Sequence, residues 1–339
     1  MMQAMVLKSP SELMQEEVAY PSPGTGETLV RVTHSGVCGT DLKIYQGGIP
    51  VDYPRIMGHE MIGEVVEVGD AQGVAVGSRV IIDPVVYCGQ CHHCQIGQEH
   101  LCPTGFLLGR DRNGGFAEYM LAPPGAIFPL PDNISSETAP LIQVMTTCLH
   151  AQRPVDVVHG ESVVVIGLGV TGQLHVQLAK ARGAGPIIGI TRSPERRALA
   201  EKMGADFTLV PGDSAIDQVL DITNGRGADL VIESVGAVSV LAEAIGMART
   251  GGRLLLFGIY TATEAALPFY QLYFKELRIF NARAARREDY PACIDLVNRG
   301  AVQLDPLISH VLPLEELERA ITMLEERDDQ RMKVILNHR

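Results

Sequence analysis

The chain lacks a candidate membrane span, since no apolar run in its 339 residues approaches the ~20 that a bilayer-crossing helix needs. A long basic run is also missing, and the formal net charge of -12 at pH 7 argues against a nucleic acid as the main partner. A signal peptide is not expected either, because Lys8 and Glu12 stand where its apolar core would be. These absences favour a cytoplasmic protein that acts on small molecules, with neither membrane nor nucleic acid as a partner.

Internal repeats, low-complexity tracts and tryptophan are absent as well. The length exceeds that of one typical domain, and a hydrophobic content of 46% is ample for two cores, so we expect two domains.

Cysteine is more abundant than a cytosolic chain needs for packing. Seven are present, and four of them, Cys88, Cys91, Cys94 and Cys102, lie within fifteen positions. A disulfide framework is not expected in the cytosol, whereas four thiolates in one loop fit a closed tetrahedral zinc site. We predict that zinc stabilises a lobe at about 84–105. A zinc finger for nucleic acid is the alternative, and the acidic chain counts against it.

The stretch 162–197 indicates a dinucleotide site. A short apolar run, 162–166, leads into Gly167-Leu-Gly169-Val170-Thr171-Gly172, and we predict a helix over 171–182 and a second strand over 186–191. Gly167 makes the tight turn, Gly169 admits a pyrophosphate to the backbone and Gly172 lets the helix pack closely. The phosphates would bind the free N–H groups at the start of that helix.

Two further buried strands are predicted over 229–236 and 253–258. Their carboxyl ends, at Val235 and at Phe257-Gly258, lie where a doubly wound sheet binds its nucleotide.

Residues 1 to about 150 are rich in strands and turns, with near alternation over 27–34 and 61–68. Two turn-prone segments, Cys38-Gly-Thr40-Asp41 and Gly58-His59-Glu60, provide a thiol, an imidazole and a carboxylate. Together these groups form a plausible open zinc site. Taken singly, each has an ordinary structural alternative: a buried thiol, a hydrogen-bonded core histidine and a solvated glutamate.

These motifs, together with Gly114-Gly-Phe-Ala-Glu-Tyr119, occur in the order seen in zinc-dependent medium-chain alcohol dehydrogenases. The sequence most resembles the sorbitol and threonine dehydrogenase branch, nearly end to end. The resemblance implies an α/β protein with a GroES-like β catalytic domain and a Rossmann doubly wound parallel-sheet domain. We expect the catalytic domain over 1–150, the Rossmann domain over 151–283 and a return to the catalytic domain over 284–339.

The resemblance also implies roles for single residues. Cys38 and His59 would be catalytic zinc ligands, with Glu60 a ligand or just behind the metal, and Asp41 would accept the other imidazole N–H of His59. Thr40 would take the proton of the alcohol. The chain departs from the family pattern in three places: Lys43 stands where the branch often has a histidine that passes the proton to solvent, Gln143 replaces the usual Cys or Glu as the fourth zinc ligand, and Gly77-Ser-Arg79 replaces a common Gly-Asp-Arg.

The implied reaction is the reversible oxidation of a secondary alcohol, such as a polyol, sugar or hydroxy acid, by a nicotinamide cofactor. Two zinc ions per chain and a homodimer or homotetramer are expected on the same grounds. The alternatives are a non-catalytic nucleotide-binding sensor or structural protein, and a zinc-free quinone reductase. Ile44, Tyr45, Arg110 and Phe116 are candidates for the substrate pocket, with packing as their alternative role.

The second Rossmann strand lacks the acidic residue that would accept the ribose hydroxyls of NAD at its end. Thr191, Arg192 and Ser193 occupy that turn, and Arg196 and Arg197 follow. We therefore predict NADP, with Arg192 on the 2′-phosphate and the Ser193 hydroxyl assisting. If the arginines are only a solvated helix face, NAD is the alternative.

Overall fold

The computed structural model describes residues 1–69, 74–326 and 328–338. The chain forms two compact units. Unit 1 contains Met1–Val144, Arg286–Asn298 and Ile308–Arg339, and unit 2 contains Met145–Ala285 and Arg299–Leu307. Helix α3 (Pro140–Gln152) carries the chain from the first unit into the second. No described helix has both the length and the apolar character that a membrane crossing requires.

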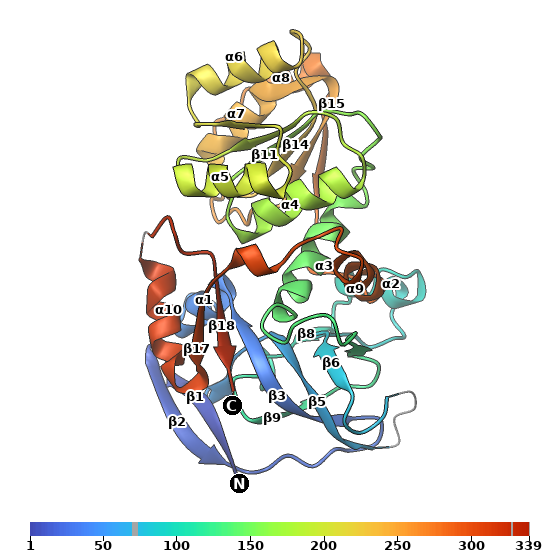
Figure 1. The fold of residues 1–339 in the computed structure, drawn as a ribbon, viewed down its shortest axis with the longest axis vertical. Coiled ribbons are helices and arrows are strands. Elements are labelled where there is room, and N and C mark those ends of the chain that lie inside the picture. The colour runs from blue at the N-terminus through green and yellow to red at the C-terminus, as the bar shows by residue number, and fades with distance from the viewer. Residues whose placement is uncertain (70–73, 327, 339) are drawn as a thin grey trace. The chain divides into compact units, whose positions relative to one another are not determined.

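A parallel sheet is the centre of unit 2 (Figure 1). In the described part of this unit its strand order is β13-β12-β11-β14-β15-β16, and every neighbouring pair is parallel. This order is that of a doubly wound dinucleotide-binding sheet, whose two halves diverge from the first strand. The strands are β11 (Val163–Ile166), β12 (Ile187–Ile190), β13 (Phe207–Leu209), β14 (Ala228–Glu233), β15 (Ala248–Leu256) and β16 (Arg278–Asn281).

Helices cover both faces of this sheet, because alternate side chains of each buried strand point to opposite sides. Val163 and Val165 pack with α4 (Val170–Ala181) and α5 (Pro194–Met203). Val164 and Ile166 pack with the helices of the other face. Those helices are α6 (Asp213–Ile222), α7 (Val238–Met247) and α8 (Phe269–Lys275).

Unit 1 is built mainly of antiparallel strands. Its largest sheet has the order β10-β6-β5-β3-β18-β17, with β9 also paired to β3. The central strands are β3 (Thr28–Val37) and β5 (Glu60–Val68), and β18 (Lys333–Asn337) pairs with β3 from the far end of the chain. The C-terminal segment thus completes the sheet that carries Glu60.

The remaining strands of unit 1 are shorter or peripheral. A second sheet has the order β2-β1-β4, and β7 pairs with β8 beside the four-cysteine loop. These and the outer strands of the main sheet are β1 (Met2–Ser9), β2 (Glu12–Val18), β4 (Arg55–Ile56), β6 (Arg79–Ile82), β7 (Val85–Val86), β8 (Phe106–Leu107), β9 (Tyr119–Ala122), β10 (Ile127–Pro129) and β17 (Ile308–Pro313).

The helices of unit 1 are short. They are α1 (Gly39–Tyr45), α2 (His92–Gln95), α9 (Asp289–Asn298) and α10 (Leu317–Glu325), with 3-10 turns η1 (Glu99–Leu101) and η3 (Leu314–Glu316). The segment after Pro313 begins as a 3-10 turn and becomes α-helical at Leu317.

The fold class predicted from the sequence is confirmed, as are its main strands and the helix after the glycine turn. The compact units differ from the predicted domains in three segments, because 145–150 and 284–285 belong to unit 2, and so do 299–307. Residues 299–307, placed in the catalytic domain, belong to unit 2, where they include the 3-10 turn η2 (Asp305–Leu307). The physical reason is local: Gln177 of α4 donates to the Gln303 carbonyl at 3.0 Å and accepts from its N–H at 2.7 Å.

Candidate functional site

The first part of the site is the start of α1. Cys38 is the N-cap residue, and Asp41 accepts a hydrogen bond from the Cys38 N–H at 2.9 Å. This bond satisfies one of the free N–H groups at the helix start and fixes the Asp41 carboxylate. The other carboxylate oxygen lies 3.4 Å from Nδ1 of His59, and both side chains are buried. Helix capping therefore holds the group that orients His59.

The turn that carries His59 depends on glycines. Gly58 has φ +93°, and a Cβ there would lie 2.7 Å from the Phe116 ring. Gly115 donates to the Gly58 carbonyl at 3.0 Å, and Phe116 donates to the Met57 carbonyl at 3.0 Å. The Gly-Gly-Phe motif thus supports the backbone on both sides of Gly58.

Three ligand-type side chains converge at this point. Atoms of Cys38, His59 and Glu60 all lie within 4.8 Å of one another. Burial lowers the pKa of His59, but the Asp41 carboxylate, and then the Cys38 thiol, raise it well above its usual range. With Nδ1 facing Asp41, Nε2 is the nitrogen left for a metal. A thiol, an imidazole and a carboxylate at this separation fit a zinc ion.

Glu60 has a partner that the motifs did not reveal. Lys333, the first residue of β18, forms an ion pair with Glu60, and the two side chains are 6% and 1% exposed. Gly36 makes room for this pair, because a Cβ at position 36 would overlap both the Glu60 carboxylate and the Lys333 side chain. No local signal pointed to Lys333, since the sheet brings it to Glu60 from the end of the chain.

The other predicted catalytic residues occupy distinct environments. Thr40 is partly buried in the first turn of α1, while Lys43, one turn later, is exposed. Gln143 is a buried residue of α3, at 8% exposure. Ile44 and Phe116, suggested as pocket residues, are instead fully buried in the core of unit 1. Both side chains pack in the hydrophobic core that supports the site.

The suggested pocket residues Tyr45 and Arg110 also have structural partners. Tyr45 donates to Glu318 at 3.1 Å, and Arg110 pairs with Asp111 at 2.7 Å.

The four cysteines of the lobe form a separate cluster. Their sulfur atoms lie 3.5–3.9 Å apart for the pairs 88–94, 91–94, 91–102 and 88–102. Tetrahedral zinc with Zn–S bonds of ~2.3 Å requires sulfurs ~3.8 Å apart, so the cluster fits a closed zinc site. Disulfides are excluded, since all four thiols are free. Hydrogen bonds from the backbone at Gln90 and Cys91 lower the pKa of Cys88 to about 6, which favours the thiolate.

The glycine turn of unit 2 fits a dinucleotide. Gly167 has φ +90°, and a Cβ at Gly172 would overlap the Gly167 carbonyl oxygen. A Cβ at Gly169, the N-cap of α4, would meet nothing within 4 Å. Open space beside the free N–H groups of a helix of this length suits a pyrophosphate. Next to it, Thr171 and Ser234 join their hydroxyls at 2.8 Å.

The turn after β12 is held by its own side chains. Arg197 donates to the carbonyls of Thr191 and Arg192, each at 2.9 Å. The Ser193 hydroxyl accepts from the Arg196 N–H at 3.2 Å as the N-cap of α5 and donates to Glu195 at 2.9 Å. This hydroxyl, predicted to assist in binding the 2′-phosphate, is already used within the protein. Arg192 has an exposed side chain.

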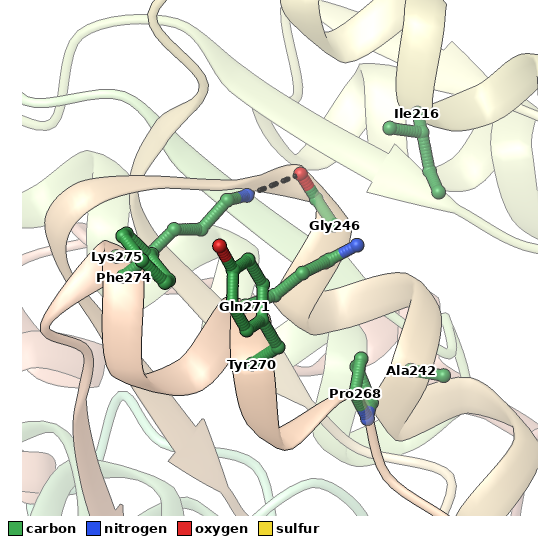
Figure 2. Close-up of a pocket in the computed structure, with 8 residues that line it drawn as sticks. All are labelled: Ile216, Ala242, Gly246, Pro268, Tyr270, Gln271, Phe274 and Lys275. Carbon is green, nitrogen blue, oxygen red and sulfur yellow. Dashed lines mark hydrogen bonds between the residues drawn. The ribbon is translucent and has the colours of Figure 1, made fainter.

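Figure 2 shows a different cavity, a pocket of about 580 Å³ in unit 2. None of the predicted site residues lines it. The Lys275 amine beside it donates to the carbonyls of Ile245, Gly246 and Ala248 at 2.7–2.9 Å and so caps the end of α7. Its lining residues come from α6, α7, α8 and the residue before α8: Ile216, Ala242, Gly246, Pro268, Tyr270, Gln271, Phe274 and Lys275.

Comparison with known families gives two matches. Residues 24–132 match the profile of the alcohol dehydrogenase GroES-like domain, and residues 170–299 match that of the zinc-binding dehydrogenase domain. An L-threonine 3-dehydrogenase of Pyrococcus horikoshii is 36% identical over 306 residues, which cover 87% of this chain and 86% of that protein.

Solved structures agree with these matches. A protein of Sinorhizobium meliloti described as a zinc-binding dehydrogenase, with NADP bound, superposes with a TM-score of 0.92 at 32% identity. An Escherichia coli alcohol dehydrogenase in complex with NADH superposes with a TM-score of 0.91 at 30% identity. Each alignment covers 99% of both chains.

Proposed function

Because the chain belongs to the zinc-dependent medium-chain alcohol dehydrogenase family and is an NAD(P)-dependent enzyme, we propose that it reversibly oxidises a secondary alcohol group of a polyol, sugar or hydroxy acid. The observation that supports this most strongly is the convergence of Cys38, His59 and Glu60, with Asp41 holding the far side of the imidazole. A zinc ion held there would supply Lewis-acid polarisation of the alcohol oxygen, and a bound nicotinamide cofactor would supply the hydride acceptor.

The chain's own residues divide the remaining work. Asp41 holds the His59 ring so that Nε2 faces the metal side. The Thr40 hydroxyl takes the proton that the alcohol releases. Lys43 follows Thr40 by three positions on α1, so the two side chains lie on adjacent turns of one face. We propose that Thr40 passes a proton on to water beside Lys43, whose exposed ammonium has no acceptor site and therefore does not take the proton itself.

Gln143 is proposed as the fourth zinc ligand, with Glu60 as its competitor. The neutral amide oxygen of Gln143 is a weaker zinc ligand than a thiolate. A catalytic site with Gln143 is also more positive than a site with cysteine at this position, because the amide carries no charge. A second zinc ion is proposed for Cys88, Cys91, Cys94 and Cys102, where it stabilises the lobe and takes no part in the reaction.

We propose NADP as the preferred cofactor, on the basis of Arg192. Its exposed side chain stands at the end of β12, where the ribose of the cofactor would bind. Arg197 donates to two carbonyls of that turn and so supports the preference for NADP by holding the backbone of Arg192 in place. Glu195 accepts a hydrogen bond from the Ser193 hydroxyl. Its negative charge would repel a phosphate and so weakens the preference for NADP. One relative carries NADP and the other NADH, so both cofactors occur among similar proteins.

The cofactor proposal is tested by kcat/KM for NADP and NAD in the wild type, Arg192→Ala and Glu195→Gln. A charge-assisted bond from Arg192 should favour NADP by about ten- to a hundredfold. Arg192→Ala should remove most of that preference, while Glu195→Gln should increase it. A wild type that prefers NAD, or an unchanged preference in Arg192→Ala, would reject the proposal.

The reaction is tested by turnover. Secondary alcohols, polyols and hydroxy amino acids are screened with both cofactors, and the absorbance of the reduced nicotinamide reports oxidation. We expect at least one class to be oxidised, with the reverse reaction on the matching ketone. A protein that binds cofactor and zinc but turns over no alcohol would be the non-catalytic alternative.

We also infer a homodimer or homotetramer. β16 is the edge strand of the described sheet, and Ile279 on it is exposed. Phe269, Tyr270, Tyr273 and Phe274 on the preceding helix α8 expose a further apolar surface, part of which is drawn in Figure 2. Edge strands and apolar patches of this kind pair readily with a second copy. Sedimentation should give an oligomer that Ile279→Lys weakens, and a monomeric wild type would reject the inference.

A further inference from the structure

A single carboxylate joins the two loops that follow β14 and β15. Glu233, the last residue of β14, is fully buried. Its Oε1 accepts hydrogen bonds from the N–H groups of Val235 at 2.7 Å and Gly236 at 2.9 Å. Its Oε2 accepts from the Tyr260 hydroxyl at 2.6 Å. One side chain thus binds the backbone of the first loop and the side chain of the second.

The backbone of Glu233 strengthens the same connection. Its carbonyl accepts from the N–H groups of Phe257 at 2.9 Å and Gly258 at 3.0 Å. The loops also touch directly, because a Cβ at Gly236 would lie 2.7 Å from the Ile259 carbonyl oxygen. A Cβ at Gly258 would lie 2.8 Å from Oε2 of Glu233. Glu233 therefore ties the two loops to each other through both its side chain and its backbone.

The chemistry of this contact depends on the charge of Glu233. A buried carboxylate is stable only when donors surround it, and three donors do so here. Burial, and then Glu233 itself, raise the pKa of Tyr260, so its hydroxyl keeps the proton that it donates. An amide in place of the carboxylate would remove the charge, and its NH2 group would require the Tyr260 hydroxyl to accept instead of donate.

The loops carry apolar side chains that nothing in the described unit covers. Val235 is 52% exposed and Ile259 is 74% exposed, although both belong to loops that Glu233 anchors. They stand at the carboxyl edge of the sheet, beside the glycine turn after β11. Exposed apolar groups on a rigid backbone are suited to bind the flat rings of a dinucleotide.

We propose that Glu233 is a positioning residue for the cofactor: through Tyr260 and the loop backbone it holds Val235 and Ile259 as a preformed apolar wall. This inference rests on the proposed nicotinamide-dependent function. Glu233 itself does not touch the reacting atoms. Because Glu233 keeps the two loops ordered before the cofactor binds, the free energy of ordering them does not reduce the affinity for the cofactor.

The test is cofactor binding, measured by calorimetry without substrate in the wild type, Glu233→Gln, Tyr260→Phe and the double variant. Glu233→Gln keeps an acceptor for the two amides but replaces the charge-assisted bond from Tyr260 by a neutral amide-to-hydroxyl bond, and we expect the Kd for the reduced cofactor to rise about five- to tenfold. Tyr260→Phe should raise it similarly. The double variant should raise the Kd by less than the product of the two single effects, because both substitutions remove the same Glu233–Tyr260 bond.

Asp229→Asn is the matched control, because Asp229 is a second carboxylate of β14, at the opposite end of the strand. It accepts from Ser162 Oγ at 2.7 Å and from Arg249. Its substitution should lower Tm while leaving the Kd unchanged. An unchanged Kd in Glu233→Gln, or an equal rise in Asp229→Asn, would overturn the inference alone. A wild type that binds no dinucleotide would overturn the proposed function as well, and one that binds cofactor without turnover would overturn only the proposed reaction.

Discussion

Replacement of Lys333 by methionine tests the buried pair beside the catalytic site. Methionine has nearly the length of the lysine chain but no charge, so Lys333→Met leaves the Glu60 carboxylate alone at 1% exposure. Removing one partner of a buried ion pair typically costs about 3 to 5 kcal/mol, because the remaining charge has lost both water and its counter-ion. For a unit of this size the loss corresponds to a fall in Tm of about 6 to 20 °C.

Zinc should reduce this loss. Once Lys333 is gone, the Glu60 carboxylate is free to turn toward the metal beside Cys38 and His59, whose ligand atoms lie within 4.8 Å of its own. The thermodynamic cycle then requires that the stability which Lys333→Met regains on zinc binding, relative to the wild type, equals its gain in zinc-binding free energy. A regain of about 1.4 kcal/mol would correspond to tenfold tighter zinc.

The assay is chemical denaturation of Lys333→Met, Glu60→Gln and the double variant, each with the catalytic site loaded and metal-free, with zinc affinity from chelator competition. The double variant should be much closer to wild type than Lys333→Met, because it has no unpaired charge. A loss below about 1 kcal/mol in metal-free Lys333→Met would refute the burial argument. An equal loss with and without zinc would refute the proposed movement of Glu60.

Three further predictions concern other parts of unit 1. Cys88→Ser should bind one zinc fewer and unfold at a lower temperature, as metal analysis and calorimetry would detect; full zinc content would contradict it. Burial raises the pKa of Asp83 to about 7, so the folded state keeps a proton that the unfolded chain loses near pH 4. The free energy of unfolding therefore falls as the pH rises from about 4 to about 7. Asp83→Asn should therefore raise the urea midpoint at pH 8 but not at pH 4, and equal midpoints at pH 8 would refute this reasoning. Gln143→Cys should bind catalytic zinc more tightly and shift the pH profile of turnover upward, and if neither changes then Gln143 does not contact the metal.

Much of the fold and the candidate site was predictable because the decisive residues are close together in the sequence. The glycine turn before α4, the four-cysteine lobe and the Ser193 cap are each set by a few consecutive positions, and the structure has all three. The residue types of the Cys38 and His59 segments suggested an open zinc site, and the family resemblance supported it, although separate loops bring the two residues together.

What the sequence could not predict depends on pairing across the fold. Lys333 belongs to no motif of the sequence, and only the pairing of β18 with β3 brings it to Glu60. Glu233 resembled an ordinary strand end, because its three donors come from two loops. Residues 299–307 carry no composition that distinguishes the two units, and their assignment depends on the bonds to Gln177.

The most direct measurement of the central claim is metal content together with turnover in His59→Ala. The wild type should hold two zinc ions per chain, and the variant should keep only the one in the four-cysteine lobe. The variant should remain folded and bind the cofactor with unchanged affinity, yet oxidise no alcohol. Only one tightly held metal in the fully loaded wild type, or normal turnover by His59→Ala, would contradict the account.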